Sequence, residues 1–214
     1  MQKLPFLLIF LFLFSSSCSQ EDSYFQRVLN ADSESENWLL HGRTYDESRF
    51  SPLKDINDSN VQDLGLAWSF ETGTNRGHES TPIVVDGMMF ISAPWSVVFA
   101  LDPKTGEKIW SFDPQADKAW ARNACCDVVN RGVAVWEDQV IFATIDGRLI
   151  SLNKDSGEVN WDVLTIDKSK PYTITGAPRI IDGKIIIGNG GGEYGVRGYI
   201  SAYDVQDGSM LWRF

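Results

Sequence analysis

Apolar and polar residues alternate in short runs between residues 82 and 203, and no stretch has the spacing of an amphipathic helix. The runs come in groups of three, and turn signals such as Asp86-Gly87 separate the first run of a group from the second. We expect strands at residues 82–85, 88–92, 97–101, 132–136, 140–144, 148–152, 178–181, 184–188 and 199–203.

Each group runs into a copy of one sequence pattern, in which an Asp or Asn stands four residues before a Gly and a Trp stands four residues after it. The copies are 51 residues apart and occupy residues 100–110, 151–161 and 202–212. The Asx and Gly residues suit a tight turn, and the Trp then lies on a fourth strand that can dock against the neighbouring unit. A repeat of about 50 residues indicates a propeller or a solenoid. We therefore predict an all-β fold, a β-propeller of four-stranded antiparallel blades, with a β-solenoid as the alternative.

The composition agrees with a packed repeat protein. Hydrophobic residues make up 43% of the 214 residues, which is enough for a core and excludes general disorder. Eight Trp and 18 Gly match a unit with one aromatic residue and one tight turn. The formal charge of -10 argues against a nucleic-acid binder, because such a protein presents a basic surface.

The N-terminus predicts export. Lys3 precedes an apolar run over residues 4–14, which is too short to span a bilayer and is typical of a signal peptide covering residues 1–18. The serines before Cys18 resemble a bacterial lipobox, although Ser15 stands where Leu is usual, so Cys18 is a candidate for lipidation and for a membrane tether. Ordinary cleavage near Ser17 is the alternative. Residues 19–37 are acidic and rich in Ser, and we interpret them as a tether.

Residues that the repeat does not need gather in the connections at one end of the blades. The third unit has six extra residues, which fall in the Gly-rich stretch 188–198 between its second and third strands. In a four-stranded meander, this loop lies at the same end as the segment that leads into each first strand. Those segments hold the other unusual residues, at 78–81, 123–131 and 173–176. We expect all four segments to converge around the axis and to form a site.

The adjacent pair Cys125 and Cys126 is the most telling feature of this face. In an oxidising compartment the two form a strained vicinal disulfide, typical of functional sites, or they pair with another chain. Two buried thiols or a metal pair are the alternatives. Arg131 can bind a carboxylate, although a lone Arg more often forms a surface ion pair. Glu193 follows three glycines and suits a hard cation such as Ca²⁺, whereas Glu79 alone is typical of a solvated acid.

Taken together, these residues resemble the pyrroloquinoline quinone (PQQ)-dependent alcohol dehydrogenases, which include methanol dehydrogenases and quinohaemoprotein alcohol dehydrogenases. The similarity extends from about Trp38 to Phe214. It is carried by residues 38–53, 78–82, 125–132, 173–178 and 188–199, of which the cysteine pair and the last segment are the most specific. The repeats alone are less specific, because non-catalytic assembly propellers of the outer membrane carry similar ones.

The resemblance implies a PQQ site built from these residues. Glu79 would contact the carboxylate side of the quinone, and Thr175 would hydrogen-bond one of its carboxylates. Arg131 would approach the reactive carbonyl oxygens. A disulfide between Cys125 and Cys126 would lie over the quinone plane.

The resemblance also implies a metal ion, Ca²⁺ or a lanthanide, with Glu193 as one ligand. Gly190, Gly191 and Gly192 would line the cofactor edge through their backbone, at positions where family members often have Ser or Ala. The implied reaction oxidises a small alcohol to an aldehyde by hydride transfer to PQQ, with an Asp as base and the metal polarising the quinone. Cytochrome c or a similar carrier in the periplasm would accept the electrons, and a haem c domain would follow in some members.

The family's propeller has eight blades and this chain supplies about three, so we expect residues 38–214 to be the N-terminal part of a longer domain, inactive alone. The catalytic Asp, a second metal ligand and the Trp below the quinone have no counterpart here. Residues 65–70 are a candidate for the strand that closes the ring. The alternatives are a non-enzymatic scaffold with PQQ-like repeats and a sugar-oxidising quinoprotein. The cysteine pair, Glu79 and the Gly-rich loop argue against the scaffold. By the pattern of the family that the chain resembles, the cysteine pair favours the alcohol type over the sugar-oxidising one.

Overall fold

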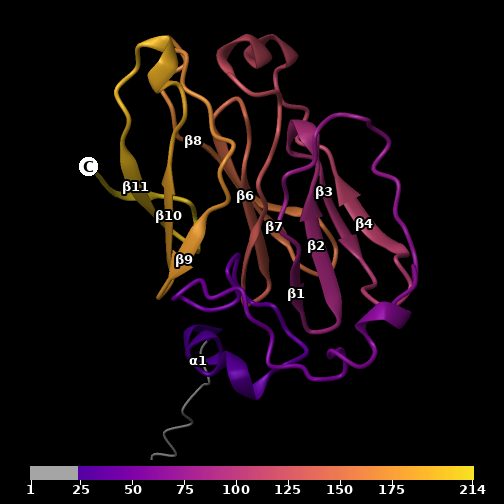
Figure 1. Ribbon diagram of the computed structural model, residues 1–214. Helices are drawn as coiled ribbons and strands as arrows, with labels where there is room; N and C mark the ends of the chain where they lie inside the picture. The colour runs from indigo at the N-terminus through magenta and orange to yellow at the C-terminus, as the bar shows by residue number, and fades with distance from the viewer. Residues whose placement is uncertain (1–23) are drawn as a thin grey trace, which may run out of the picture.

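Three four-stranded sheets make up most of the chain in its computed structural model, which describes residues 24–214. Within each sheet the strands follow one another in chain order, and neighbouring strands are antiparallel. Figure 1 shows the three sheets standing next to one another like the blades of a fan. The predicted class, an all-β propeller of four-stranded blades, is thus confirmed. The predicted signal peptide and the Cys18 lipidation site lie outside the described residues.

The strands match the runs expected from the hydrophobic pattern. Blade one consists of β1 (Ile83–Val85), β2 (Met88–Ser92), β3 (Val98–Leu101) and β4 (Lys108–Phe112). Blade two consists of β5 (Ala134–Trp136), β6 (Gln139–Ala143), β7 (Arg148–Asn153) and β8 (Val159–Leu164). Blade three consists of β9 (Arg179–Ile181), β10 (Lys184–Gly188), β11 (Ile200–Asp204) and β12 (Met210–Arg213). Short 3-10 helices lie in the connections: η2 (Val61–Asp63), η3 (Pro94–Ser96), η4 (Lys118–Asn123) and η5 (Gly192–Tyr194).

Blade two forms the centre of the core, because blades one and three cover its two faces. Every residue of β5 and β6 is buried, whereas every residue of β12 is exposed. Side chains from all three blades join one continuous apolar cluster, which includes Phe90, Phe142 and Ile185.

The repeated Trp residues join one blade to the next. The indole Nε1 of Trp110, on β4, donates a hydrogen bond of 2.9 Å to the carbonyl of Lys154 in the β7–β8 turn of blade two. Its ring lies so close to Gly157 (φ 74°) that an added Cβ would come within 2.8 Å of it. Trp161 makes the same pair of contacts in blade three, with the Val205 carbonyl at 3.2 Å and with Gly208. The sequence prediction that the repeat Trp docks on the neighbouring unit is confirmed for Trp110 and Trp161.

Trp68 occupies the equivalent place on blade one. Its Nε1 donates to the Pro103 carbonyl at 3.1 Å, and its ring lies against Gly106, where an added Cβ would come within 2.5 Å. Residues 65–70 have no assigned strand here, yet Trp68 contacts blade one as Trp110 contacts blade two. Residues 65–70 therefore lie where the last strand of a preceding blade would lie, which supports their interpretation as the ring-closing strand.

Residues 24–37, the described part of the segment interpreted as a tether, are folded against the blades, which corrects that interpretation for these residues. Helix α1 (Tyr24–Leu29) and the 3-10 turn η1 (Ala31–Ser33) lie below the blades in Figure 1. Tyr24 and Val28 are 3% and 2% exposed, and the Tyr24 ring packs 5.5 Å from that of Trp136. Burial raises the pKa of the Tyr24 hydroxyl strongly. Tyr24 and Val28 are therefore core residues, which the acidic and Ser-rich composition of this segment did not indicate.

Ion pairs hold α1 in place. Arg27 lies 2.7 Å from Glu34 and 2.7 Å from Asp86, which sits in the β1–β2 turn. Asp86 also contacts Lys154 of blade two at 3.0 Å. The hydrogen bond from Arg27 lowers the pKa of both carboxyl groups. None of the helices within residues 24–214 has the length and apolar character needed to cross a bilayer.

Candidate functional site

The segments that lead into the first strand of each blade meet, as the repeat predicts. The Thr81 amide donates to the Arg131 carbonyl at 3.2 Å, and the Arg131 amide donates to the Thr175 carbonyl at 3.0 Å. Gly132 (φ 136°) allows the close approach, since an added Cβ would lie 3.3 Å from the Thr81 carbonyl. Backbone hydrogen bonds therefore hold the three connections together.

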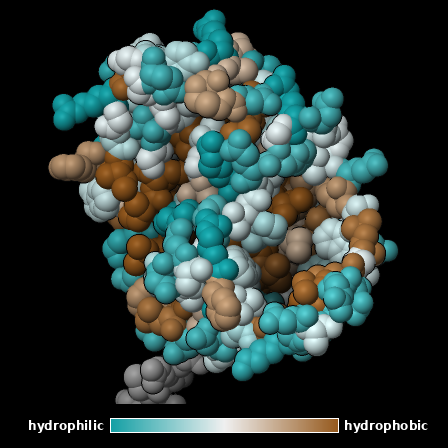
Figure 2. All heavy atoms as spheres, in the orientation of Figure 1, coloured by the Kyte–Doolittle hydropathy of each residue, from teal (hydrophilic) through white to brown (hydrophobic). Residues whose placement is uncertain are grey.

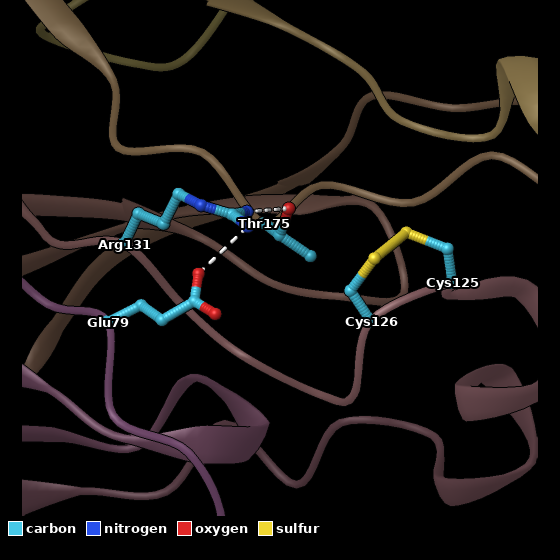
Figure 3. The surroundings of a disulfide bond; sticks show 5 residues. All are labelled: Glu79, Cys125, Cys126, Arg131 and Thr175. Carbon is cyan, nitrogen blue, oxygen red and sulfur yellow. Dashed lines mark hydrogen bonds and ion pairs between the residues drawn. A yellow bond between two sulfur atoms is a disulfide. The ribbon is translucent and has the colours of Figure 1, made fainter.

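Two side chains from neighbouring connections bind the Arg131 guanidinium (Figure 3). Nη2 lies 2.8 Å from Glu79 Oε2, and Nη1 donates to Thr175 Oγ1 at 2.6 Å. The side chains of Arg131 and Glu79 are 43% and 41% exposed, so a ligand can reach them. The arrangement orients a positive charge and a hydroxyl toward one place, as recognition of a carboxylate or a quinone oxygen requires.

Cys125 and Cys126 are joined by a disulfide and lie on the segment that follows η4. Figure 3 shows the disulfide near Arg131 and Thr175, and both cysteines are exposed. The intramolecular bond agrees with the vicinal pairing expected from the sequence rather than with two thiols or a metal pair.

A small cavity connects these groups. Its volume is about 120 Å³, and it is lined by Ala124, Cys125, Cys126, Asp127, Val129, Arg131, Thr173, Thr175, Gly190 and Glu193. A second hollow of about 530 Å³ shares Arg131, Thr175 and Gly190 with it and extends to His41 and Arg179. Both are lined by polar and apolar residues together, as ligand sites commonly are.

The Gly-rich loop is attached to this wall by backbone pairing. Gly190 and Thr173 exchange two hydrogen bonds, of 2.7 and 3.3 Å, and an added Cβ at Gly190 would come within 2.8 Å of Thr173 Oγ1. At Gly191 (φ 108°), an added Cβ would come within 2.4 Å of the Pro171 carbonyl. These two glycines serve close packing within the protein, while nothing lies within 4 Å of an added Cβ at Gly192.

Most of the residues predicted for the site come together. Six of them line the small cavity: Cys125, Cys126, Arg131, Thr175, Gly190 and Glu193. Glu79 belongs to the site through Arg131, whereas Gly191 and Gly192 do not line the cavity. Within residues 24–214, no three His, Cys, Asp or Glu side chains lie together as a ready-made metal site.

One supporting residue, Asn130, is not apparent from the sequence. It is 1% exposed, and its amide side chain accepts hydrogen bonds from Ser92 Oγ (2.7 Å) and the Gly132 amide (3.0 Å). It donates to Ser96 Oγ (3.2 Å) and the Ala143 carbonyl (2.8 Å). Such a fully bonded buried amide fixes the backbone next to Arg131. Only its position directly before Arg131 could have drawn attention to it.

Comparison with known proteins agrees with this geometry. Residues 38–214 match the family model described as "Glucose/ethanol/alcohol dehydrogenase, beta-propeller domain". The chain belongs to this family. Among its curated members, a quinohemoprotein alcohol dehydrogenase ADH-IIG of Pseudomonas putida is 54% identical over 88% of this chain. The 1-butanol dehydrogenase (cytochrome c) of Thauera butanivorans is 54% identical over 78% of it.

Solved structures of family members superpose closely. A structure of ADHIIG from Pseudomonas putida HK5 has a TM-score of 0.87 and 54% identity over 88% of this chain. A europium-containing methanol dehydrogenase has a TM-score of 0.83 and 38% identity over the same share. The chain covers 28% and 33% of these two structures, and about a quarter of the length of the curated relatives it matches.

Proposed function

We propose that this chain contributes to a PQQ-dependent dehydrogenase that oxidises an alcohol to an aldehyde. The observation that carries the proposal is the cavity wall, in which a vicinal disulfide, Arg131, Thr175 and Glu193 come together from separate blades. Relatives at about 54% identity bear the names of alcohol dehydrogenases, which favours an alcohol over a sugar as substrate. The same residues argue against a binding scaffold, because a scaffold has no need of them on one face.

The residues present fit the quinone. PQQ is a flat anion, and the wall offers it the exposed guanidinium of Arg131 and the hydroxyl of Thr175. The disulfide supplies a polarisable, largely apolar surface suited to a ring face. When bound, PQQ supplies the two-electron oxidation of the alcohol. In this proposal, Cys125 and Cys126 would cover the quinone plane, and Gly190 would admit its edge.

Arg131 supplies the positive charge that would contact the cofactor. Glu79 and Thr175 restrict its guanidinium from two sides, so the positive charge is fixed before any ligand enters. A charge held in this way stabilises negative charge that develops on a neighbouring oxygen without a cost of reorientation. Glu79 keeps the site from being strongly cationic, because it balances the charge of Arg131.

Glu193 is the proposed metal ligand of this chain. It lines the cavity beside Gly190, and an exposed carboxylate oxygen is the donor that Ca²⁺ or a lanthanide takes. The europium-containing relative supports a lanthanide as one of the two options. The remaining ligands would come from outside the described residues. A metal ion there would act as a Lewis acid.

The partners and location follow from the same family relationship. The name of the Thauera relative supports cytochrome c as electron acceptor, and the quinohemoprotein relatives support a haem-bearing domain in the full-length protein. The predicted signal sequence supports a periplasmic location, with a membrane tether if Cys18 is lipidated. Metabolic labelling with a tagged fatty acid would test the tether, because Cys18→Ser abolishes labelling only if this residue carries the lipid.

The first test uses a full-length protein, in which this chain is continued to the length of its relatives. Glu193→Gln keeps the volume of the side chain and removes its charge. We expect weaker binding of Ca²⁺ and loss of alcohol-dependent dye reduction after reconstitution with PQQ, with partial rescue by excess Ca²⁺. Metal content and activity are measured together, and the fold is checked by circular dichroism. Glu158→Gln, at an exposed position in the β7–β8 turn, is the control.

The outcomes separate the proposals. Unchanged metal content and activity in Glu193→Gln would show that the metal assignment is wrong and leave the quinone site standing. If the unsubstituted full-length protein neither binds PQQ nor reduces the dye with any alcohol, the scaffold alternative is supported instead.

A further inference from the structure

Trp95 reaches from blade one to the segment that carries the disulfide. It lies in η3, between β2 and β3, at the same end of the blades as η4 and η5 (Figure 1). Its amide donates to the carbonyl of Val128, two residues after Cys126, at 2.9 Å. Trp95 (φ 66°) and Ser96 (φ 61°) both have left-handed backbone, which bulky residues adopt only where the surroundings enforce it.

Trp95 belongs to a small apolar cluster that also includes residues before and after the disulfide in the chain. A small apolar cluster, separate from the main core, consists of Ala116, Val128 and Ile145, with Trp95, Ala121 and Ala124 packed against it. Ala124 directly precedes Cys125. One aromatic ring from blade one thus lies in the same cluster as residues before and after the cysteine pair.

Two cations contact the same ring, and one of them also binds the disulfide segment. Lys118 Nζ lies 4.0 Å and Arg76 Cζ lies 5.7 Å from the ring centroid of Trp95. Arg76 also forms an ion pair with Asp127, the residue that follows Cys126. The Val128 amide and Arg76 lower the pKa of the Asp127 carboxyl, which stays ionised at neutral pH. Asp127 itself has positive φ (70°).

We propose that Trp95 and Arg76 are positioning residues that clamp the Cys125–Cys126 segment in the place where it covers the cofactor. Neither residue lines the cavity, so they would act only through the segment. Arg76 holds the part of the segment after the pair through the ion pair with Asp127, and Trp95 holds it through the hydrogen bond to Val128. Ala124, before the pair, packs against the same apolar cluster as Trp95. The expected consequence, a higher affinity for PQQ, rests on the proposed function. The contacts that hold the segment exist in the apoprotein and do not depend on that function.

The test compares variants of the full-length protein. Arg76→Gln removes the ion pair with Asp127 at an exposed position, and Trp95→Leu removes the ring. Arg76→Lys keeps a charge that can pair with Asp127. Lys118→Gln is the control, since Lys118 contacts the same ring and has no ion pair with the disulfide segment among the described residues.

Three quantities are measured for each variant: the dissociation constant for PQQ, the melting temperature, and the rate at which phosphine reduces the disulfide in the apoprotein. Alkylation and mass spectrometry of the peptide that holds both cysteines follow the reduction; before reduction its mass is two hydrogens below that of the dithiol. We expect Arg76→Gln and Trp95→Leu to weaken PQQ binding and to speed reduction of the disulfide, each by roughly tenfold. Loss of a residue that supports a metal ligand has an effect of this size. Arg76→Lys recovers most of both, and Lys118→Gln matches the unsubstituted protein.

The clamp is refuted if Arg76→Gln and Trp95→Leu leave both the reduction rate and the PQQ affinity unchanged, whatever the melting temperature does. If Trp95→Leu does not fold, Arg76→Gln decides the question alone, because its side chain lies on the surface. Failure of the unsubstituted protein to bind PQQ contradicts the proposed function, whereas faster reduction in the apoprotein variants still establishes the clamp.

Discussion

At the scale of single residues, the glycines of the Gly-rich loop have different roles. Gly190 and Gly191 lie against Thr173 and Pro171, where no side chain fits, while Gly192 faces open space. The sequence alone presents all three as one run beside the cofactor. The structure divides them into two residues that the protein needs for packing and one that it does not.

Gly191→Ala should therefore destabilise the protein, because the new Cβ would meet the Pro171 carbonyl and φ of 108° is unsuited to Ala. We expect a loss of about 1–3 kcal/mol in the free energy of unfolding. Gly192→Ala introduces the same methyl group without a contact and should change stability little. Urea unfolding of both variants checks this, and equal stabilities would mean that the loop does not pack as described.

Sequence reasoning found Arg131, Thr175 and the cysteines because the repeat register places whole connections at one end of the molecule. It could not find Arg76 or Trp95, because their role depends on contacts with Asp127 and Val128, which lie in the connection of the next blade. Side-chain pairs between blades leave no periodic signal. The same holds for Asn130, whose four hydrogen bonds involve residues of two blades.

At the scale of elements, the contact between a Trp and the turn of the next blade is the repeated unit of assembly. The contribution of the Trp contact to stability can be measured separately from backbone strain, because two turn glycines have the same backbone conformation and only one of them contacts a Trp. Gly157 (φ 74°) lies against the Trp110 ring, while Gly87 (φ 77°) has no atom within 4 Å of an added Cβ.

Ala at either position adds a similar backbone strain of about 1 kcal/mol. Only Gly157→Ala would also push Trp110 out of its place, so we expect its melting temperature to fall several degrees below that of Gly87→Ala. Differential scanning calorimetry measures the difference. Equal melting temperatures would indicate that the Trp contacts add nothing to stability.

Helix α1 is an element that the hydrophobic pattern missed, because six residues with two buried side chains give too short a signal. The docking of α1 on the blades should depend on pH. The pKa values of Glu34 and Asp86 are lowered from 4.5 and 3.8, so their contribution is complete above those values and is lost as the pH falls through the folded-state pKa values.

We therefore expect α1 to detach from the blades as the pH falls below the ordinary carboxyl values of 4.5 and 3.8 and through the lowered pKa values of Glu34 and Asp86, before the sheets unfold. Hydrogen exchange of residues 24–37, corrected for the intrinsic rate at each pH, should rise relative to that of β6. Arg27→Gln should raise exchange at neutral pH and remove most of the acid dependence. If the protection of residues 24–37 from hydrogen exchange does not change with pH, these ion pairs do not hold α1 on the blades.

At the scale of the whole molecule, exposed apolar side chains lie on both outer sides of the blade array. Trp212 and Phe214 are 45% and 93% exposed on the side of blade three, and Leu66 is 86% exposed on the side of blade one. Figure 2 shows apolar side chains gathered over blade three, at the left of the view. Trp68, Trp110 and Trp161 each dock on a following turn, whereas Trp212 presents its ring to solvent.

Such a surface favours association when these residues are produced alone. Residues 24–214 should form dimers or larger species at micromolar concentration, and Trp212→Ser should shift them toward monomer. Sedimentation velocity measures the distribution, with Leu29→Ser as the control at another exposed apolar position. A monomer that Trp212→Ser leaves unchanged would show that these faces are not adhesive.

The contact between each Trp and the following turn also bears on how the chain folds. Strands pair only with their neighbours in the chain, so the contacts within a blade are local. The Trp contacts join each blade to the next one along the chain, so they too link segments that are close in sequence. We therefore expect folding to spread from one blade to its neighbour, a process that needs only the adjoining blade and can accompany gradual emergence of the chain from a ribosome.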